Sequence, residues 1–229
     1  MTRDAHPRDD AALADQLRRR FRTSSSTVEV GAAPVTLLHP ANADDLISEA
    51  DFVEDDRLPY WADVWPSSTV LAGAVAALPG TGRTALELGC GIGLVASAAA
   101  RAGFAVTATD YYEDALLFAR ANAWHTTGRA IAVRHVDWRR LPDDLGRYDL
   151  VLASDVLYER TYADLIAAAL DATIAPGGRG LIADPGRVAA PAFVEACTAR
   201  ALRADRVSQH PWRAGEIRQT IDLYEVTRP

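Results

Sequence analysis

From residue 84 onward, short apolar runs alternate with longer segments rich in apolar and small residues. The runs have the length of buried strands, and each ends on or beside an acidic residue. The expected strands cover 84–88, 105–109, 131–136, 148–153 and 180–183, and the expected helices include 113–124 and 162–174. Strands that alternate with helices indicate a mostly parallel, Rossmann-like α/β sheet of seven strands with helices on both faces.

The two ends of the chain follow other patterns. Leu13, Leu17 and Phe21 recur every four residues, which predicts one face of a short helix that ends in arginines. A basic arm that docks a partner is the alternative. A hairpin over 28–38 and a second short helix over 44–50 should follow, and 217–226 alternates as expected for an antiparallel edge hairpin with 206–211. We therefore divide the chain into an extension, 1–57, and a main domain, 58–229.

Composition narrows the class of protein. A chain of 229 residues with 49% hydrophobic content can bury one substantial core. The formal charge of −7 argues against a broad nucleic-acid or anionic-membrane surface, and an acidic surface fits a partner that carries lysines. Two distant cysteines, Cys90 and Cys197, indicate neither a disulfide scaffold nor a zinc site, so we expect no metal. Without a long apolar run or a hydrophobic leader, we expect a cytoplasmic monomer.

The glycine turn after the first strand of the main domain carries the strongest chemical signal. Glu87, Gly89, Gly91 and Gly93 form the pattern E-x-G-x-G-x-G before a helical segment of small residues. Glycines allow a sharp bend and close approach of a ligand to the backbone. The dinucleotide fingerprint G-x-G-x-x-G fails, because position 94 is Leu, and this disfavours a nicotinamide oxidoreductase. A carboxylate beside the turn suits a cationic ligand, although a purely structural turn is the alternative.

Acidic residues mark the ends of the later strands, where ligands of parallel sheets bind. Asp110 ends the second strand, about 20 residues after the first glycine of the turn. A carboxylate at this distance can accept hydrogen bonds from the two hydroxyls of a ribose. Asp137 and Trp138 end the third, where a carboxylate can accept from an adenine amine and an indole can stack on its ring. Asp155 and Asp184 end the next two strands. Core packing is the alternative for Trp138, as it is for Trp61 and Trp65, which could also roof a pocket.

The turn from Glu87 to Gly93 resembles the first motif of the seven-strand, class I S-adenosylmethionine methyltransferases. With Trp65, Asp110, Asp137-Trp138 and the stretch from Ser154 to Tyr158, the resemblance extends to the protein-lysine methyltransferase branch. The segments 60–66 and 183–187 are similar to the lysine methyltransferase of the electron-transfer flavoprotein β-subunit. The resemblance covers roughly residues 58–190.

The resemblance, together with the residues above, assigns three groups to the site. The cofactor group is Trp65, Glu87, Gly89, Cys90, Gly91, Gly93, Asp110, Tyr111, Asp137, Trp138 and Ser154. The catalytic group that faces the acceptor is Asp155 and Tyr158. The substrate group is Trp61, Asp184 and Arg187, where Arg187 could instead simply pair with Asp184.

The expected activity is transfer of a methyl group from S-adenosyl-L-methionine to a protein lysine, with S-adenosyl-L-homocysteine as product. Asp155 would capture and orient the amine, since a carboxylate also stabilises its protonated form. A small-molecule N-methyltransferase is the nearer alternative, and a non-catalytic module that keeps the cofactor fold is the more distant one.

Overall fold

The computed structural model describes residues 7–46 and 59–229. Its N-terminal part contains α1 (Pro7–Arg20), the antiparallel strands β1 (Thr23–Val28) and β2 (Val35–Pro40), and the 3-10 helix η1 (Ala43–Leu46). The predicted helix and hairpin are therefore present, although the hairpin begins at Thr23 and ends at Pro40, outside the predicted range 28–38 at both ends. The second predicted helix is short in its described part, and residues 47–50, like the proposed boundary at 57, lie outside the described residues.

One sheet of seven strands organises the rest of the chain. Its order is β5-β4-β3-β6-β7-β9-β8, with β3 to β7 parallel and β9 antiparallel to both neighbours. The strands are β3 (Thr84–Leu88), β4 (Ala105–Asp110), β5 (Ala132–His135), β6 (Tyr148–Ser154), β7 (Ile174–Asp184), β8 (Arg203–Ala214) and β9 (Ile217–Thr227). The predicted fold class is confirmed, including the antiparallel hairpin at the edge.

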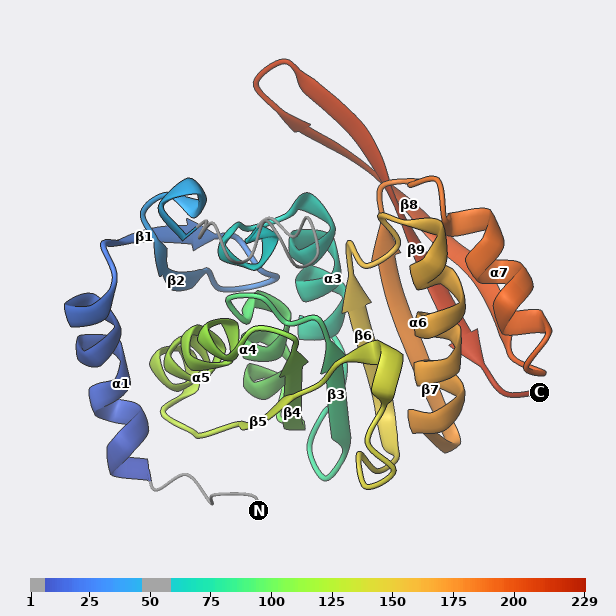
Figure 1. Cartoon of the computed structure of the whole chain (residues 1–229), viewed down its shortest axis with the longest axis horizontal. Coiled ribbons are helices and arrows are strands. Elements are labelled where there is room, and N and C mark those ends of the chain that lie inside the picture. Colours follow the sequence, from blue (N-terminus) through green and yellow to red (C-terminus); the bar gives the residue numbers. More distant parts are fainter. Residues whose placement is uncertain (1–6, 47–58) are drawn as a thin grey trace.

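Helices cover both faces of this sheet (Figure 1). The side chains of α1, α3, α4 and α5 enter one core cluster, and those of α6 and α7 enter the other. The bounds are η2 (Tyr60–Ala62), α3 (Pro66–Ala76), α4 (Leu94–Arg101), α5 (Glu113–Thr127), η3 (Trp138–Arg140), α6 (Arg160–Thr173) and α7 (Ala190–Thr198). The helix α7 was not predicted from the sequence, and Ile174 begins β7 where the predicted helix would have ended.

The two cores follow from the alternation of side chains along each strand. On β6, Leu150 and Leu152 point into the first cluster, whereas Val151 and Ala153 point into the second. Successive strand residues face opposite sides of a sheet, so a continuous apolar run is what a sheet covered on both faces requires.

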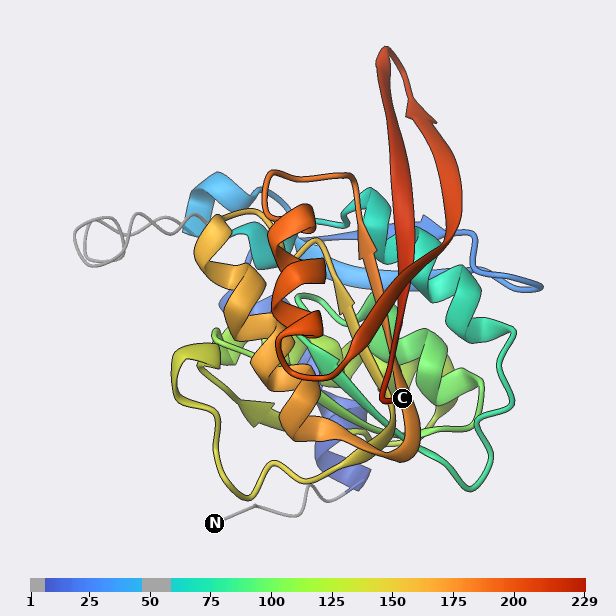
Figure 2. The same cartoon turned by 90° about the vertical axis from the view of Figure 1, so that its right-hand side faces the viewer.

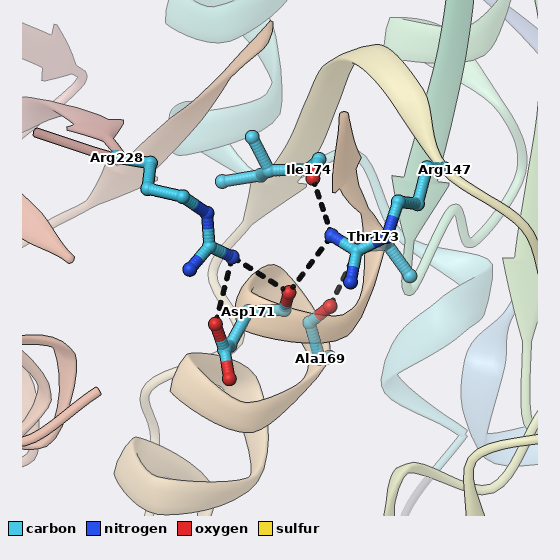
Figure 3. A network of polar contacts seen from close by, with 6 residues as sticks. All are labelled: Arg147, Ala169, Asp171, Thr173, Ile174 and Arg228. Atoms are coloured by element: carbon cyan, nitrogen blue, oxygen red, sulfur yellow. Dashed lines mark hydrogen bonds and ion pairs between the residues drawn. The ribbon is translucent and has the colours of Figure 1, made fainter. Parts of the chain in front are cut away.

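Arginines close the carboxyl-terminal end of α6 (Figure 3). The guanidinium of Arg147 donates to the backbone oxygens of Asp171 and Ile174, at 3.3 and 2.8 Å, and Arg228 donates to the oxygen of Asp171 at 3.0 Å. The last carbonyls of a helix lack partners within the helix, and positive charge is favourable there. This network fixes the helix where the chain turns into β7.

A single buried amide joins the N-terminal hairpin to the main domain. Asn122 on α5 accepts from the Leu38 backbone nitrogen at 2.8 Å and donates to the oxygens of Leu38 and Ile92, at 2.9 and 2.8 Å. Ile92 lies in the glycine turn, so one side chain connects β2 to the loop predicted to hold the cofactor.

The β8–β9 hairpin extends beyond the body of the protein (Figures 1 and 2). Pairing between β7 and β9 stops at Asp184 and Asp222, and β9 residues before Asp222 pair only with β8. The overhang therefore projects from the same end of the sheet at which the parallel strands finish. Within the described ranges, no helix is both long and apolar enough to cross a membrane.

Candidate active site

A cavity of about 600 Å³ opens at the carboxyl ends of β3, β4 and β6. Ligand sites in open parallel sheets lie at this edge, and the volume is within the usual range for small-molecule pockets. The walls come from η2, the glycine turn, the start of η3, the segment after β6 and the turn after β7. Fourteen of the sixteen predicted residues line it: Trp61, Trp65, Glu87, Gly89, Cys90, Gly91, Asp110, Tyr111, Asp137, Trp138, Ser154, Asp155, Tyr158 and Arg187.

The first two glycines of the turn allow the backbone to pack closely against two tryptophans. Gly89 and Gly91 have φ angles of +71° and +50°, in the left-handed region. A Cβ atom at Gly91 would lie 2.9 Å from the backbone oxygen of Trp61, and one at Gly89 would lie 3.0 Å from the Trp138 ring. Both glycines line the cavity, and neither position could carry a side chain without displacing the neighbouring tryptophan.

Gly93 serves a different contact. Its φ is +84°, and a Cβ atom there would lie 2.6 Å from the Cα of Ala119 on α5. Gly93 is not among the cavity-lining residues. The structure therefore places the third glycine where α4 and α5 pack, and not against the predicted ligand.

Glu87 is a buried carboxyl group that faces the cavity. The residue is only 1% exposed, and its Oε2 atom is buried with no hydrogen-bond partner among the described residues. Burial raises the pKa of this carboxyl well above its usual value, and a backbone hydrogen bond from Ala96 partly offsets the rise. A buried acceptor without a partner costs free energy, which a cationic or amine-bearing ligand would recover.

Asp110 ends β4 and is held by backbone groups. Its two oxygens accept from the nitrogens of Gly91, at 2.9 Å, and Tyr112, at 3.0 Å. Burial raises the pKa of this carboxyl, whereas the hydrogen bonds oppose the rise. Burial likewise raises the pKa of the Cys90 thiol beside it, so this cysteine stays protonated and inert. Asp110 is thus fixed beside the glycine turn, where it lines the cavity.

The opposite wall combines a paired carboxylate with aromatic rings. Asp137 accepts from the backbone nitrogen of Arg139 at 3.0 Å and from its guanidinium Nε at 2.9 Å. The Trp138 ring stands edge-on to Tyr162, with centroids 5.6 Å apart, and its Nε1 is buried with no partner among the described residues. Arg139 also lies 5.8 Å from the centroid of the Tyr111 ring. The indole ring of Trp138 lines the cavity, and an indole can stack on a purine.

The side of the cavity that is predicted to face the acceptor, called the acceptor side below, is built around Asp155. This residue has a φ of +58°, which is uncommon for a residue other than glycine, and its side chain is 6% exposed. Arg187 donates to its Oδ1 from Nε at 2.6 Å and from Nη2 at 2.5 Å. The suggestion that Arg187 simply pairs with Asp184 is wrong, because its guanidinium reaches Asp155 and only its backbone nitrogen reaches Asp184, at 2.7 Å.

Asp184 holds the backbone of the turn that carries Arg187. It is fully buried, it is absent from the cavity-lining residues, and its Oδ2 has no partner among the described residues. Burial raises its pKa, and the charge of Asp155 adds to the rise. The structure therefore brings Asp184 next to Arg187 through the turn, without placing it in the cavity.

Several lining residues were not predicted from the sequence. Two of them, Tyr60 and Tyr162, flank the predicted Tyr158, and their ring centroids lie 6.5 and 4.6 Å from that of Tyr158. Tyr60 also meets Trp65 edge-on at 5.8 Å, and the Trp65 Nε1 donates to the Tyr60 backbone oxygen at 2.8 Å. Tyr60 precedes Trp61 in an aromatic segment, and Tyr162 lies in the first turn of α6, four residues after Tyr158, so closeness in sequence to predicted residues could have indicated both.

The strand order and the position of the cavity define the class of protein: a class I, Rossmann-like methyltransferase fold. The ribosomal protein L11 methylase of Lactobacillus delbrueckii subsp. bulgaricus has the same fold, with a TM-score of 0.56, 24% identity and coverage of 72% of this chain and 80% of that one. The magnesium protoporphyrin IX methyltransferase of Synechocystis PCC 6803, solved with bound S-adenosylhomocysteine, has a TM-score of 0.56 at 17% identity, covering 71% of this chain and 83% of its own.

Residues 55–188 match the family described as lysine methyltransferase, and the chain belongs to this family. It is 32% identical over 133 residues to the electron transfer flavoprotein beta subunit lysine methyltransferase of Danio rerio, covering 56% of this chain and 51% of that protein. It is 36% identical over 120 residues to the protein N-lysine methyltransferase METTL21A of Mus musculus, covering 48% and 54%. The predicted family is confirmed, and the chain spans about half the length of these curated relatives.

Proposed function

We propose that this protein is an S-adenosyl-L-methionine-dependent methyltransferase that methylates the side-chain nitrogen of a lysine in a partner protein. Membership of the lysine methyltransferase family supports the reaction class. The observation that carries the proposal is the cavity itself, which combines a glycine cradle, a buried carboxyl without a partner among the described residues, and an acidic acceptor side lined by aromatic rings.

The residues present fit the cofactor. Glu87 offers its unpartnered oxygen to a positively charged amino-acid group, and Gly89 and Gly91 line the cavity beside it. Asp110 lies at the β4 end, where a carboxylate can accept from ribose hydroxyls. Asp137 and the ring of Trp138 can hold an adenine. The polar groups are thus arranged for a ligand with a cationic end and an aromatic end.

S-adenosylmethionine, when bound, supplies a methyl group made electrophilic by a sulfonium. The chain's own task is alignment: the cradle fixes one reactant, while Asp155 and Tyr158 orient the incoming nitrogen. Well-oriented reactants can gain about 7–11 kcal/mol of the barrier in the best intramolecular cases. Geometry is therefore the main contribution that we assign to these residues.

The acceptor nitrogen must also lose a proton before it attacks. A lysine amine has a reference pKa of about 10.4, and burial among aromatic rings favours its neutral form. Tyr60 and Tyr158 stand at the opening, 49% and 37% exposed, where they can enclose the aliphatic part of a lysine. Asp155 captures and orients the amine, and the proton leaves to water.

The proposal is tested first by calorimetric titration of the purified protein with S-adenosylmethionine and S-adenosylhomocysteine, with NADH as the control. We expect binding of the first two ligands only. Transfer of labelled methyl groups into a cell lysate, separated into protein and small-molecule fractions, should then give label in protein that hydrolysis identifies as methyllysine. Label confined to small molecules would overturn the protein substrate, and binding of NADH alone would overturn the class.

A further inference from the structure

The chain's own cation already occupies the acceptor side. The Arg187 guanidinium contacts the Asp155 carboxylate at 2.5 and 2.6 Å and lies 5.7 Å from the centroid of the Trp65 ring. Its side chain is about one-third exposed, whereas that of Asp155 is nearly buried. A guanidinium carries a permanent positive charge. The free protein thus holds a positive charge between a carboxylate and an aromatic face.

An acceptor lysine would need the same two surfaces. Ammonium groups bind carboxylates by charge-assisted hydrogen bonds and aromatic faces by cation–π attraction. Two cations in one small, partly buried space repel each other. The Arg187 guanidinium and the ammonium group of an acceptor lysine therefore cannot occupy this space together. A nearly buried Asp155 without any cation would be costly, which explains why a resident cation is present.

We propose that the Arg187 guanidinium is a placeholder, which occupies the position of the acceptor amine in the free protein and leaves it when a substrate lysine enters. This inference rests on the proposed function and adds a residue that controls access to the acceptor position. Arg187 is therefore a specificity determinant: only a partner whose amine replaces its contacts with Asp155 gains entry.

The local backbone allows the side chain to move while its anchor stays. Asp184 holds the backbone nitrogen of Arg187, and Gly186 before it has a φ of +79° with no atom within 4 Å of an added Cβ. Val188 after it is 60% exposed. The backbone of the turn is thus held by Asp184, whereas the residues on either side of Arg187 have open surroundings. Rotation about the side-chain bonds alone can therefore move the guanidinium toward solvent.

The composition provides an unusually clean test. The chain contains 24 arginines and no lysine. The substitution Arg187→Lys therefore places the single lysine side chain of the protein on the acceptor side. If the placeholder occupies the acceptor position, this lysine becomes a substrate of its own protein. In that step the methyl carbon–sulfur bond breaks, sulfur keeps the electron pair, a carbon–nitrogen bond forms and the amine proton leaves to water.

The experiment incubates the full-length variant, purified with a lysine-free tag, with labelled S-adenosylmethionine and locates the label by peptide mass spectrometry. The matched control is Arg179→Lys, since Arg179 also pairs with a carboxylate, Glu225, at 2.6 Å but does not line the cavity. We expect label at position 187 of the first variant and no label at position 179 of the second. Label on both would overturn the inference, because it would show that position is unimportant.

A second variant keeps the inference testable if Arg187→Lys misfolds. Arg187→Ala vacates the position, so butylamine, used as a free primary amine, should be methylated about tenfold faster than by the unaltered protein, as one removed competing ion pair predicts. Absence of both effects, while the unaltered protein still methylates lysate proteins, overturns the placeholder alone. If the unaltered protein neither binds S-adenosylmethionine nor transfers methyl groups, the proposed function fails, and the placeholder fails with it.

Discussion

Replacing Gly93 by alanine should destabilise the whole domain. The residue has a φ of +84°, and a left-handed conformation costs about 1–2 kcal/mol for a residue with a Cβ atom. The added carbon would lie 2.6 Å from the Cα of Ala119 and 2.7 Å from its Cβ. Overpacking of this kind costs about 1–3 kcal/mol. Because the two costs act together, we expect the free energy of unfolding to fall by about 2–5 kcal/mol.

The assay is urea and thermal unfolding beside a matched control. Gly73 lies inside α3, and a Cβ atom there meets nothing within 4 Å, so Gly73→Ala should stabilise by about 1 kcal/mol. At about 2–4 °C per kcal/mol, Tm should fall by roughly 4–20 °C for Gly93→Ala and rise by roughly 2–4 °C for Gly73→Ala. A Gly93→Ala protein that unfolds like the unaltered one, but has lost cofactor affinity, would refute the packing role. It would indicate instead that Gly93 contacts the cofactor, as the sequence predicted.

Three further predictions concern the cavity. Because burial raises the pKa of Glu87, the folded protein retains a proton that the unfolded chain releases. Stability should therefore fall as pH rises above the usual carboxyl range toward the raised pKa, and Glu87→Gln should reduce that fall in urea unfolding. A bound cation favours the ionised carboxylate, so cofactor affinity should rise over the same range in the unaltered protein only, as calorimetry would show. Asp110→Ala should weaken S-adenosylmethionine binding by about 10- to 100-fold, the loss of charge-assisted hydrogen bonds, and unchanged affinity would reject the ribose contact. Asp155→Ala should keep cofactor affinity and reduce methyl transfer at least about 100-fold, whereas Asp164→Ala, an exposed ion-paired aspartate on α6, should do neither.

The sequence predicted the parts of this site that depend on local order along the chain. Acidic residues at successive strand ends must meet at one edge of a parallel sheet, so the strand pattern alone was enough to place Asp110, Asp137 and Asp155 together. Spacing could not separate the roles of the three glycines, since the function of Gly93 depends on Ala119, which is distant in sequence and adjacent only after α4 and α5 pack.

Pairing between side chains from different strands was the other limit. Arg187 lies closer in sequence to Asp184 than to Asp155, and proximity along the chain favoured the wrong partner for its guanidinium. The choice is made by the turn after β7, which uses Asp184 to hold the backbone and thereby directs the side chain toward β6. Tyr60 escaped prediction for a similar reason, because its ring meets that of the predicted Tyr158 only in the folded protein.

The amide of Asn122 changes how the first segment of the chain should be regarded. An optional cap on an autonomous catalytic unit would have few polar connections to that unit. Here Leu38 of the hairpin and Ile92 of the glycine turn share one buried side chain, and Leu13, Leu17 and Leu37 belong to the same apolar cluster as α4 and α5. Deleting the segment would leave buried polar groups without partners in the turn that we propose holds the cofactor. The N-terminal residues are therefore part of the scaffold that shapes this turn, and shortening the chain from that end should disturb the proposed site.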